Sequence, residues 1–118
     1  MENVVEEIKD CVDHINKKES DIDWIGSKDG NYAMKWKKFK GKFRNVSYDN
    51  GFGAQKIAQD LIVAFNDNSW LEREEYDGAE SWTYKEAPVF NGYHDYTIID
   101  VESAGFIGWE NLSELNED

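Results

Sequence analysis

Carboxylates and large aromatic side chains crowd one stretch of the chain, residues 70–84, which reads WLEREEYDGAESWTY. Acids at this density could be paired catalytic carboxylates, metal ligands, a solvated face, or a surface bound by a basic partner. Only one base, Arg73, lies among them. The side chains we predict to contact a partner are Glu72, Glu74, Glu75, Tyr76, Asp77, Glu80 and Trp82.

Residues for nucleophilic or acid–base catalysis are few. A nucleophile needs a base and a group that orients the base, and the only histidines are His14 and His94. His94 precedes Asp95, but neighbours on a strand point to opposite faces, so this adjacency is weak support for a catalytic pair. We therefore predict no catalytic residue and no enzyme. A small enzyme with paired carboxylates is an alternative, because any acidic chain offers candidates.

Metal and cofactor motifs are also missing from the sequence. Zinc sites use several cysteines or histidines at ligand spacing, and the chain has one cysteine and two histidines. The acidic run from Asp67 lacks the glycine of an EF-hand calcium loop. Residues 50–56, NGFGAQK, lack the Lys-Ser/Thr pair of a phosphate-binding loop. We predict no metal site and no cofactor.

Charge and composition restrict the partners. The 118 residues carry a formal net charge of -12, which repels nucleic acid and anionic membranes and favours a basic protein partner. The N-terminal MENVVEEIKD has no signal-peptide pattern, and no run approaches the ~20 apolar residues of a membrane span. With Cys11 as the only cysteine, no intrachain disulfide can form. We expect a cytosolic protein with one domain, residues 1–118.

Two amphipathic helices are predicted. Asn3 is the expected N-cap of the first, which runs to about Lys18 with an apolar stripe that includes Cys11 as a buried structural thiol. The second follows a turn at residues 48–53 and ends near Asn66, with Leu61 and Phe65 facing the core. The rest of its stripe is Ile57, Ala58, Ile62 and Ala64.

Short strands are predicted around these helices, at residues 21–26, 32–36 and 43–48, as an antiparallel meander with one apolar and one lysine-rich face. Another strand is expected at residues 94–102, followed by a docked tail with Phe106, Ile107, Trp109, Leu112 and Leu115. The predicted fold class is α+β, an antiparallel sheet of four or more strands packed by two amphipathic helices.

The order of these elements resembles small acidic phage-encoded type II anti-CRISPR proteins, over about residues 2–86. After Ala87 the predicted strand and tail depart from that pattern. The resemblance implies a non-enzymatic inhibitor whose carboxylates occupy the surface with which an RNA-guided DNA nuclease reads its DNA motif. The positions that carry it are Ile57, Leu61, Ile62, Ala64, Phe65 and Trp70, then Glu72, Glu74, Glu75, Asp77 and Glu80.

The acids and aromatics therefore predict an acidic mimic of nucleic acid that binds a basic host nuclease or another nucleic-acid-binding protein, with no direct contact to nucleic acid or membrane. An immunity protein or antitoxin that neutralises a basic nuclease toxin is the alternative, because it would need the same acidity. The density of negative charge along the acidic stretch depends on whether the stretch is helical or extended. A helical stretch would approach the density of DNA, whereas an extended one would fall below half of it.

Overall fold

A computed structural model describes residues 1–49, 51, 56–105 and 108–117. The chain divides into two compact units, Met1–Pro88 and Val89–Asp118. The single domain expected over residues 1–118 stays a prediction. The elements in chain order are β1 (Glu2–Asn3), α1 (Val4–His14), η1 (Glu19–Asp21), β2 (Ile22–Ser27), β3 (Ala33–Met34), α2 (Trp36–Phe43), β4 (Ser47–Tyr48), β5 (Leu61–Phe65), β6 (Ser69–Tyr76), β7 (Ala79–Glu86) and α3 (Leu112–Asn116).

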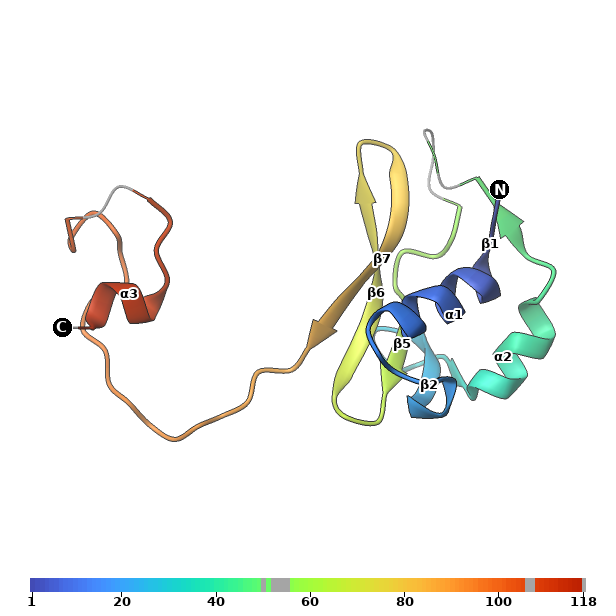
Figure 1. Ribbon diagram of the computed structural model, residues 1–118, viewed down its shortest axis with the longest axis horizontal. Coiled ribbons are helices and arrows are strands. Elements are labelled where there is room, and N and C mark those ends of the chain that lie inside the picture. Colours follow the sequence, from blue (N-terminus) through green and yellow to red (C-terminus); the bar gives the residue numbers. More distant parts are fainter. Residues whose placement is uncertain (50, 52–55, 106–107, 118) are drawn as a thin grey trace. The chain divides into compact units, whose positions relative to one another are not determined.

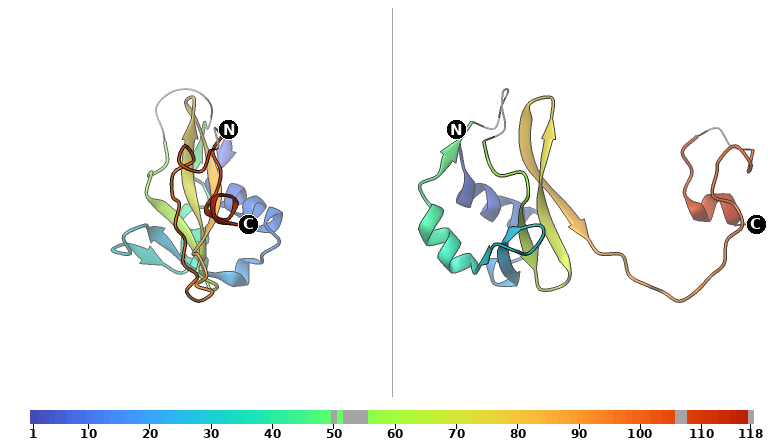
Figure 2. Two further views of the ribbon diagram at one scale, coloured as in Figure 1. Left: turned by 90° about the vertical axis from the view of Figure 1, so that its left-hand side faces the viewer. Right: turned by 180° about the vertical axis from the view of Figure 1, so that it is seen from behind.

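The first unit is a five-stranded antiparallel sheet in the order β3-β2-β5-β6-β7, with a two-stranded pair of β1 and β4 beside it (Figure 1). Helices α1 and α2 pack on one face of the sheet, which we call the inner face. The predicted α+β class with an antiparallel sheet of four or more strands is confirmed. Figure 2 shows the same arrangement from two further sides.

Helix α1 begins as its sequence predicts. The Asn3 side chain accepts hydrogen bonds from the backbone N–H groups of Val5 and Glu6, both at 3.1 Å, so it caps the helix. The helix ends at His14 rather than near Lys18, because the chain turns at Asn16, where φ is 62°. Its apolar stripe lies in the core with residues of β2, β5 and β6.

The predicted second helix is wrong, because Leu61–Phe65 is strand β5 at the centre of the sheet. Strands β2 and β6 flank it on both sides, and side chains on both of its faces are buried. An apolar run that is buried on both faces has no polar alternation to distinguish it from a helix. The turn predicted at residues 48–53 and the start of the predicted helix lie partly outside the described part of the chain, at residues 50 and 52–55.

The predicted meander is only partly correct. Strand β2 lies at Ile22–Ser27 as expected, but β3 has two residues and the lysine-rich segment after it is helix α2. Trp36 and Phe39 are buried in the core and Phe43 packs against it, at helical spacing. The expected lysine-rich strand face is therefore a lysine-rich helix surface, and only Ser47–Tyr48 of the third predicted strand forms a strand, β4.

The second unit, Val89–Asp118, contains helix α3 but no strand among its described residues, so the strand predicted at residues 94–102 is wrong. The Asn116 side chain accepts hydrogen bonds from the backbone N–H groups of Thr97 (2.9 Å) and Ile98 (3.0 Å). Leu115 is buried, Trp109 is fully exposed, and Phe106 and Ile107 lie outside the described residues.

Candidate functional site: the acidic hairpin

The acidic aromatic stretch forms a two-stranded hairpin of β6 and β7. Asp77 and Gly78 connect the strands with φ angles of 51° and 84°, and Tyr76 pairs with Ala79 directly before and after them. Two consecutive residues with positive φ are typical of the tight turn that matches the twist of a hairpin. The stretch is therefore extended, and alternate side chains point to opposite faces of the sheet.

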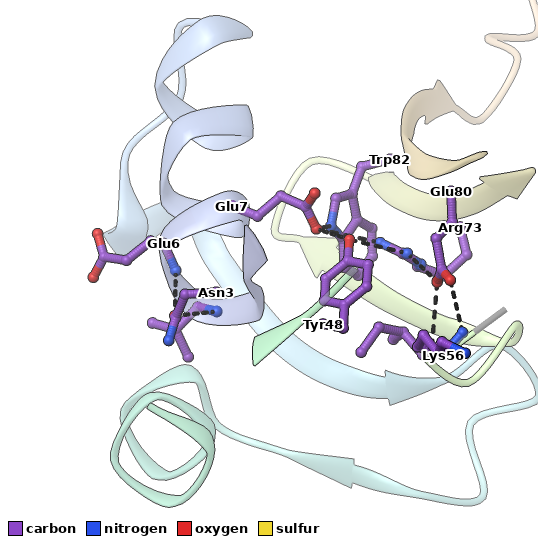
Figure 3. A network of polar contacts seen from close by, with 10 residues as sticks. Asn3, Glu6, Glu7, Tyr48, Lys56, Arg73, Glu80 and Trp82 are labelled. Atoms are coloured by element: carbon purple, nitrogen blue, oxygen red, sulfur yellow. Dashed lines mark hydrogen bonds and ion pairs between the residues drawn. The ribbon is translucent and has the colours of Figure 1, made fainter. Parts of the chain in front are cut away.

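Arg73 and Glu80 lie on the inner face of the hairpin, in a buried network of polar contacts (Figure 3). Arg73 Nη2 donates to Glu80 Oε1 at 2.6 Å, and each side chain is 4% exposed. Glu80 also accepts from the backbone N–H groups of Lys56 at 2.6 Å and Ile57 at 3.2 Å. Glu80 thus holds the segment before β5 against the hairpin.

Glu7 of α1 completes this network from the helix side. Its Oε1 accepts hydrogen bonds from Trp82 Nε1 at 2.9 Å and from the Tyr48 hydroxyl, and it lies 3.5 Å from Arg73 Nη1. The Arg73 guanidinium lies over the Trp82 ring, 4.6 Å from its centroid, and over the Tyr48 ring at 5.4 Å. One arginine therefore connects α1, β4 and both strands of the hairpin.

The electrostatics of the network keep its ion pair charged. Burial raises the pKa of Glu80, but the N–H groups of Lys56 and Ile57 and the Arg73 guanidinium outweigh it, so the net shift is downward. Burial, and then the hydrogen bond to Glu7, raise the pKa of Tyr48. An ionised Glu80 that already accepts three hydrogen bonds is suited to hold the fold together rather than to transfer protons.

The seven predicted contact residues therefore divide between the interior and the surface. Glu80 is buried and Trp82 is half-buried, and both are bonded within the protein. Sequence reasoning missed Glu7, Tyr48 and Arg73 as their partners. The available signal was Arg73, the one base in the stretch. It follows the core residue Leu71 by two positions, and therefore lies on the same face of the strand.

The surface group lies at the turn end of the hairpin. Glu74, Glu75, Tyr76 and Asp77 are exposed, and Tyr76 is 83% exposed. Glu75 Oε1 accepts from the Gly78 backbone N–H at 2.7 Å, so this carboxylate also closes the turn. We call these four residues the acidic tip. In the described part of the chain no Lys or Arg side chain forms an ion pair with any of them.

Glu72 connects the acidic tip to the outer face of the sheet, the face opposite α1 and α2. It is half-buried, lies 3.7 Å from Lys28 Nζ, and accepts from Trp70 Nε1 at 2.8 Å. Beside Glu72 on the outer face lie three cross-strand neighbours from adjacent strands: Trp24 of β2, Ala64 of β5 and Trp70 of β6. The outer face thus carries a half-buried aromatic row that leads through Glu72 to the tip.

The extended conformation sets the spacing of the carboxylates. At about 3.4 Å per residue, side chains on one face recur roughly every 7 Å, as do Glu72 and Glu74 on β6. This spacing is about twice the 3.4 Å between charges along a DNA strand. The hairpin therefore presents separate carboxylates rather than a continuous row of charges like that of a phosphate backbone.

Other candidates for chemistry are not assembled into a site. His14 is exposed at the end of α1, and His94 is exposed in the second unit. Cys11 is half-buried, and burial together with Glu7 and Asp10 raises the pKa of its thiol, which disfavours the reactive thiolate. Among the described residues, no group of three or more His, Cys, Asp or Glu side chains could hold a metal ion.

Comparisons with protein-family models, curated proteins and solved structures found no match. Among the described residues, no helix has both the length and the apolar character needed to cross a bilayer.

Proposed function

We propose that the protein catalyses no reaction and binds, through the acidic tip, a basic surface with which another protein reads nucleic acid. The proposal rests chiefly on one observation: three exposed carboxylates and Tyr76 gather at the hairpin end, with no base between Arg73 and Lys85 to neutralise them. Arginine side chains bind carboxylates through paired hydrogen bonds and stack on aromatic rings. The acidic tip offers both kinds of contact.

The carboxylate spacing favours one form of mimicry. Carboxylates about 7 Å apart along a strand are too sparse to copy a phosphate backbone. They suit a partner that places individual arginines on the acceptors of base edges, as the arginines that read guanines in a DNA recognition motif do. The proposed partner is therefore an RNA-guided DNA nuclease, or another DNA-reading protein, in the cytosol of the host cell.

The outer face of the sheet supports this proposal by extending the contact. Trp24 and Trp70 are half-buried there, and tryptophan is among the side chains that contribute most to protein interfaces. An aromatic row beside an acidic tip would give an interface with an apolar centre and a charged edge. Glu80 and Trp82 take no direct part, because they support the hairpin from inside.

The test is competition with DNA. Tagged protein is used to capture its partner from host cells, the partner is identified and purified, and its binding to DNA is measured while the protein is added. We expect a basic, DNA-binding partner that releases its DNA as the protein saturates it. A ternary complex, in which the partner holds protein and DNA together without loss of affinity, would contradict the proposal.

A further inference from the structure

A separate apolar pocket lies between α2, strands β2 and β3, and the chain before β5. Its volume is about 430 Å³, within the range of ligand-binding pockets. Two phenylalanines of α2, Phe39 and Phe43, form one wall, with ring centroids 4.7 Å apart. Met34, Ile57 and Leu61 line the rest together with other small and apolar residues.

The pocket reaches the protein surface. Tyr32 is 78% exposed and Val46 is 38% exposed, although both line it. Phe43, Met34 and Leu61 are only partly buried. The described residues leave this concave apolar surface open, which makes it a candidate binding site.

The charge beside the pocket indicates what binds. Phe39 and Phe43 line the pocket and Trp36 does not, so the pocket faces the flank of α2 nearer Phe39. Helical spacing places Lys38 and Lys42 of α2 on that flank, and Lys35, the N-cap residue before the helix, precedes Lys38 by three positions. Lys42 Nζ lies 5.7 Å from the centroid of Phe43, a ring that lines the pocket.

These three lysines form no ion pair within the described residues, unlike Lys40 on the opposite flank, which lies 3.3 Å from Glu19. From the N-cap residue Lys35 to Lys42 the rise along the helix axis is about 10 Å, at 1.5 Å per residue. A row of cations of this length beside an apolar pocket matches an acidic peptide better than a compact small molecule. Asp60, on the other wall, would keep the acids of such a chain on the α2 side.

We propose that this pocket binds an acidic peptide segment of a partner protein, which inserts bulky apolar side chains between Phe39, Phe43 and Leu61 while its carboxylates meet Lys35, Lys38 and Lys42. This site goes beyond the function proposed for the acidic tip and uses a different surface. A peptide helix with apolar residues at i and i+4 has the shape for such a groove.

The probe is a fluorescein-labelled peptide with two leucines four positions apart and glutamates at the other positions, titrated with the full-length protein and followed by fluorescence anisotropy. We expect saturable binding that weakens with salt. Charge reversal of the three lysines, in the variant Lys35→Glu/Lys38→Glu/Lys42→Glu, should weaken peptide binding tenfold or more. The matched control, Lys37→Glu/Arg44→Glu/Lys85→Glu, makes the same change in net charge at residues that do not line the pocket, and it should keep at least half the affinity.

Two further measurements separate the apolar and charged parts. Ala33→Trp, which fills the pocket, should abolish binding, with the circular dichroism spectrum unchanged. A peptide with serine in place of leucine should not bind. Equal binding by the lysine-reversal and control variants, equal binding by a peptide with glutamine in place of glutamate, or no saturable binding of the probe would each overturn the proposal.

Discussion

The ion pair of Arg73 and Glu80 shows how a residue that looks functional in sequence can serve the fold. Both side chains are 4% exposed, and Glu80 accepts hydrogen bonds from two backbone N–H groups in addition to Arg73. A charged pair in the interior is stable only while each member keeps its partner, because an uncompensated charge there loses its hydration without replacement. Glu80 is therefore a structural acid within an otherwise exposed acidic stretch.

Replacement of Glu80 by alanine should lower the free energy of unfolding by about 3–5 kcal/mol, because Arg73 loses its nearest anion and two backbone N–H groups lose their acceptor. Glu74→Ala, at an exposed position of the same hairpin, should change it by less than about 0.5 kcal/mol. Urea denaturation measures both values. Equal stability of the two variants would show that Glu80 is not bound in the way described.

Asp67 gives the protein a specific response to acid. Its carboxylate accepts from Lys17 Nζ at 2.5 Å and from the Ser69 side chain, contacts that lower its pKa from 3.8 to about 2. The stability that Asp67 contributes is complete above its unfolded pKa of 3.8 and is lost as pH falls through about 2.

The difference in stability between the parent and Asp67→Asn should therefore be constant above about pH 5 and shrink as the pH approaches 2. Thermal melts of both proteins across this range measure it. A difference that stays the same down to pH 2 would mean that the lowered pKa of Asp67 makes no contribution.

Individual residues were predictable from the sequence where their contacts are local. Asn3 caps α1 as expected, because an N-cap contacts residues two and three positions away. The bonds of Glu7 to Trp82 and Arg73 join residues 75 and 66 positions apart. No local sequence pattern specifies such long-range bonds. Bonds of this kind hold Glu80 and Trp82, two of the predicted contact residues, in the interior.

At the scale of elements, β5 shows where sequence patterns fail. Leu61–Phe65 fits an apolar helix stripe as well as a buried strand, and the choice depends on whether neighbouring strands exist to pair with it. Residues 32–36 show the opposite error, in which a predicted strand runs into helix α2. Alternation suggested a strand through Trp36, whereas Trp36, Phe39 and Phe43 bury one helical stripe. The hairpin of β6 and β7 was not predicted, although Asp77-Gly78 is a local signal for a tight turn.

The position of β5 predicts an unequal cost for two leucine substitutions. Leu71 on β6 is 2% exposed in the core, so Leu71→Ala should lower the free energy of unfolding by about 2–5 kcal/mol. Leu61, the first residue of β5, is only partly buried and lines the apolar pocket. Leu61→Ala should therefore lower the free energy of unfolding by clearly less. Equal losses in urea denaturation would mean that the pocket is closed around Leu61 in solution.

At the scale of the whole molecule, charge is strongly segregated. All 13 bases precede residue 86, and six of them lie between Lys35 and Arg44. The acidic tip and the three lysines beside the apolar pocket, Lys35, Lys38 and Lys42, are thus surfaces of opposite sign in the first unit, Met1–Pro88. Attraction between each surface and its partner should be screened by salt, since the Debye length is only about 8 Å at physiological ionic strength. Salt dependence therefore distinguishes specific use of the acidic tip from a solvated face.

The central claim is that the acidic tip binds a basic partner, and the most direct test is the affinity of two charge variants for the captured partner. Glu74→Lys/Asp77→Asn alters the tip and keeps a turn-compatible residue at position 77, whereas Asp13→Lys/Asp10→Asn makes the same net change on the exposed side of α1. We predict that the tip variant binds at least tenfold more weakly, with a shallower salt dependence, and that the α1 variant binds like the parent. A folded tip variant with the parent's affinity and salt dependence would contradict this account.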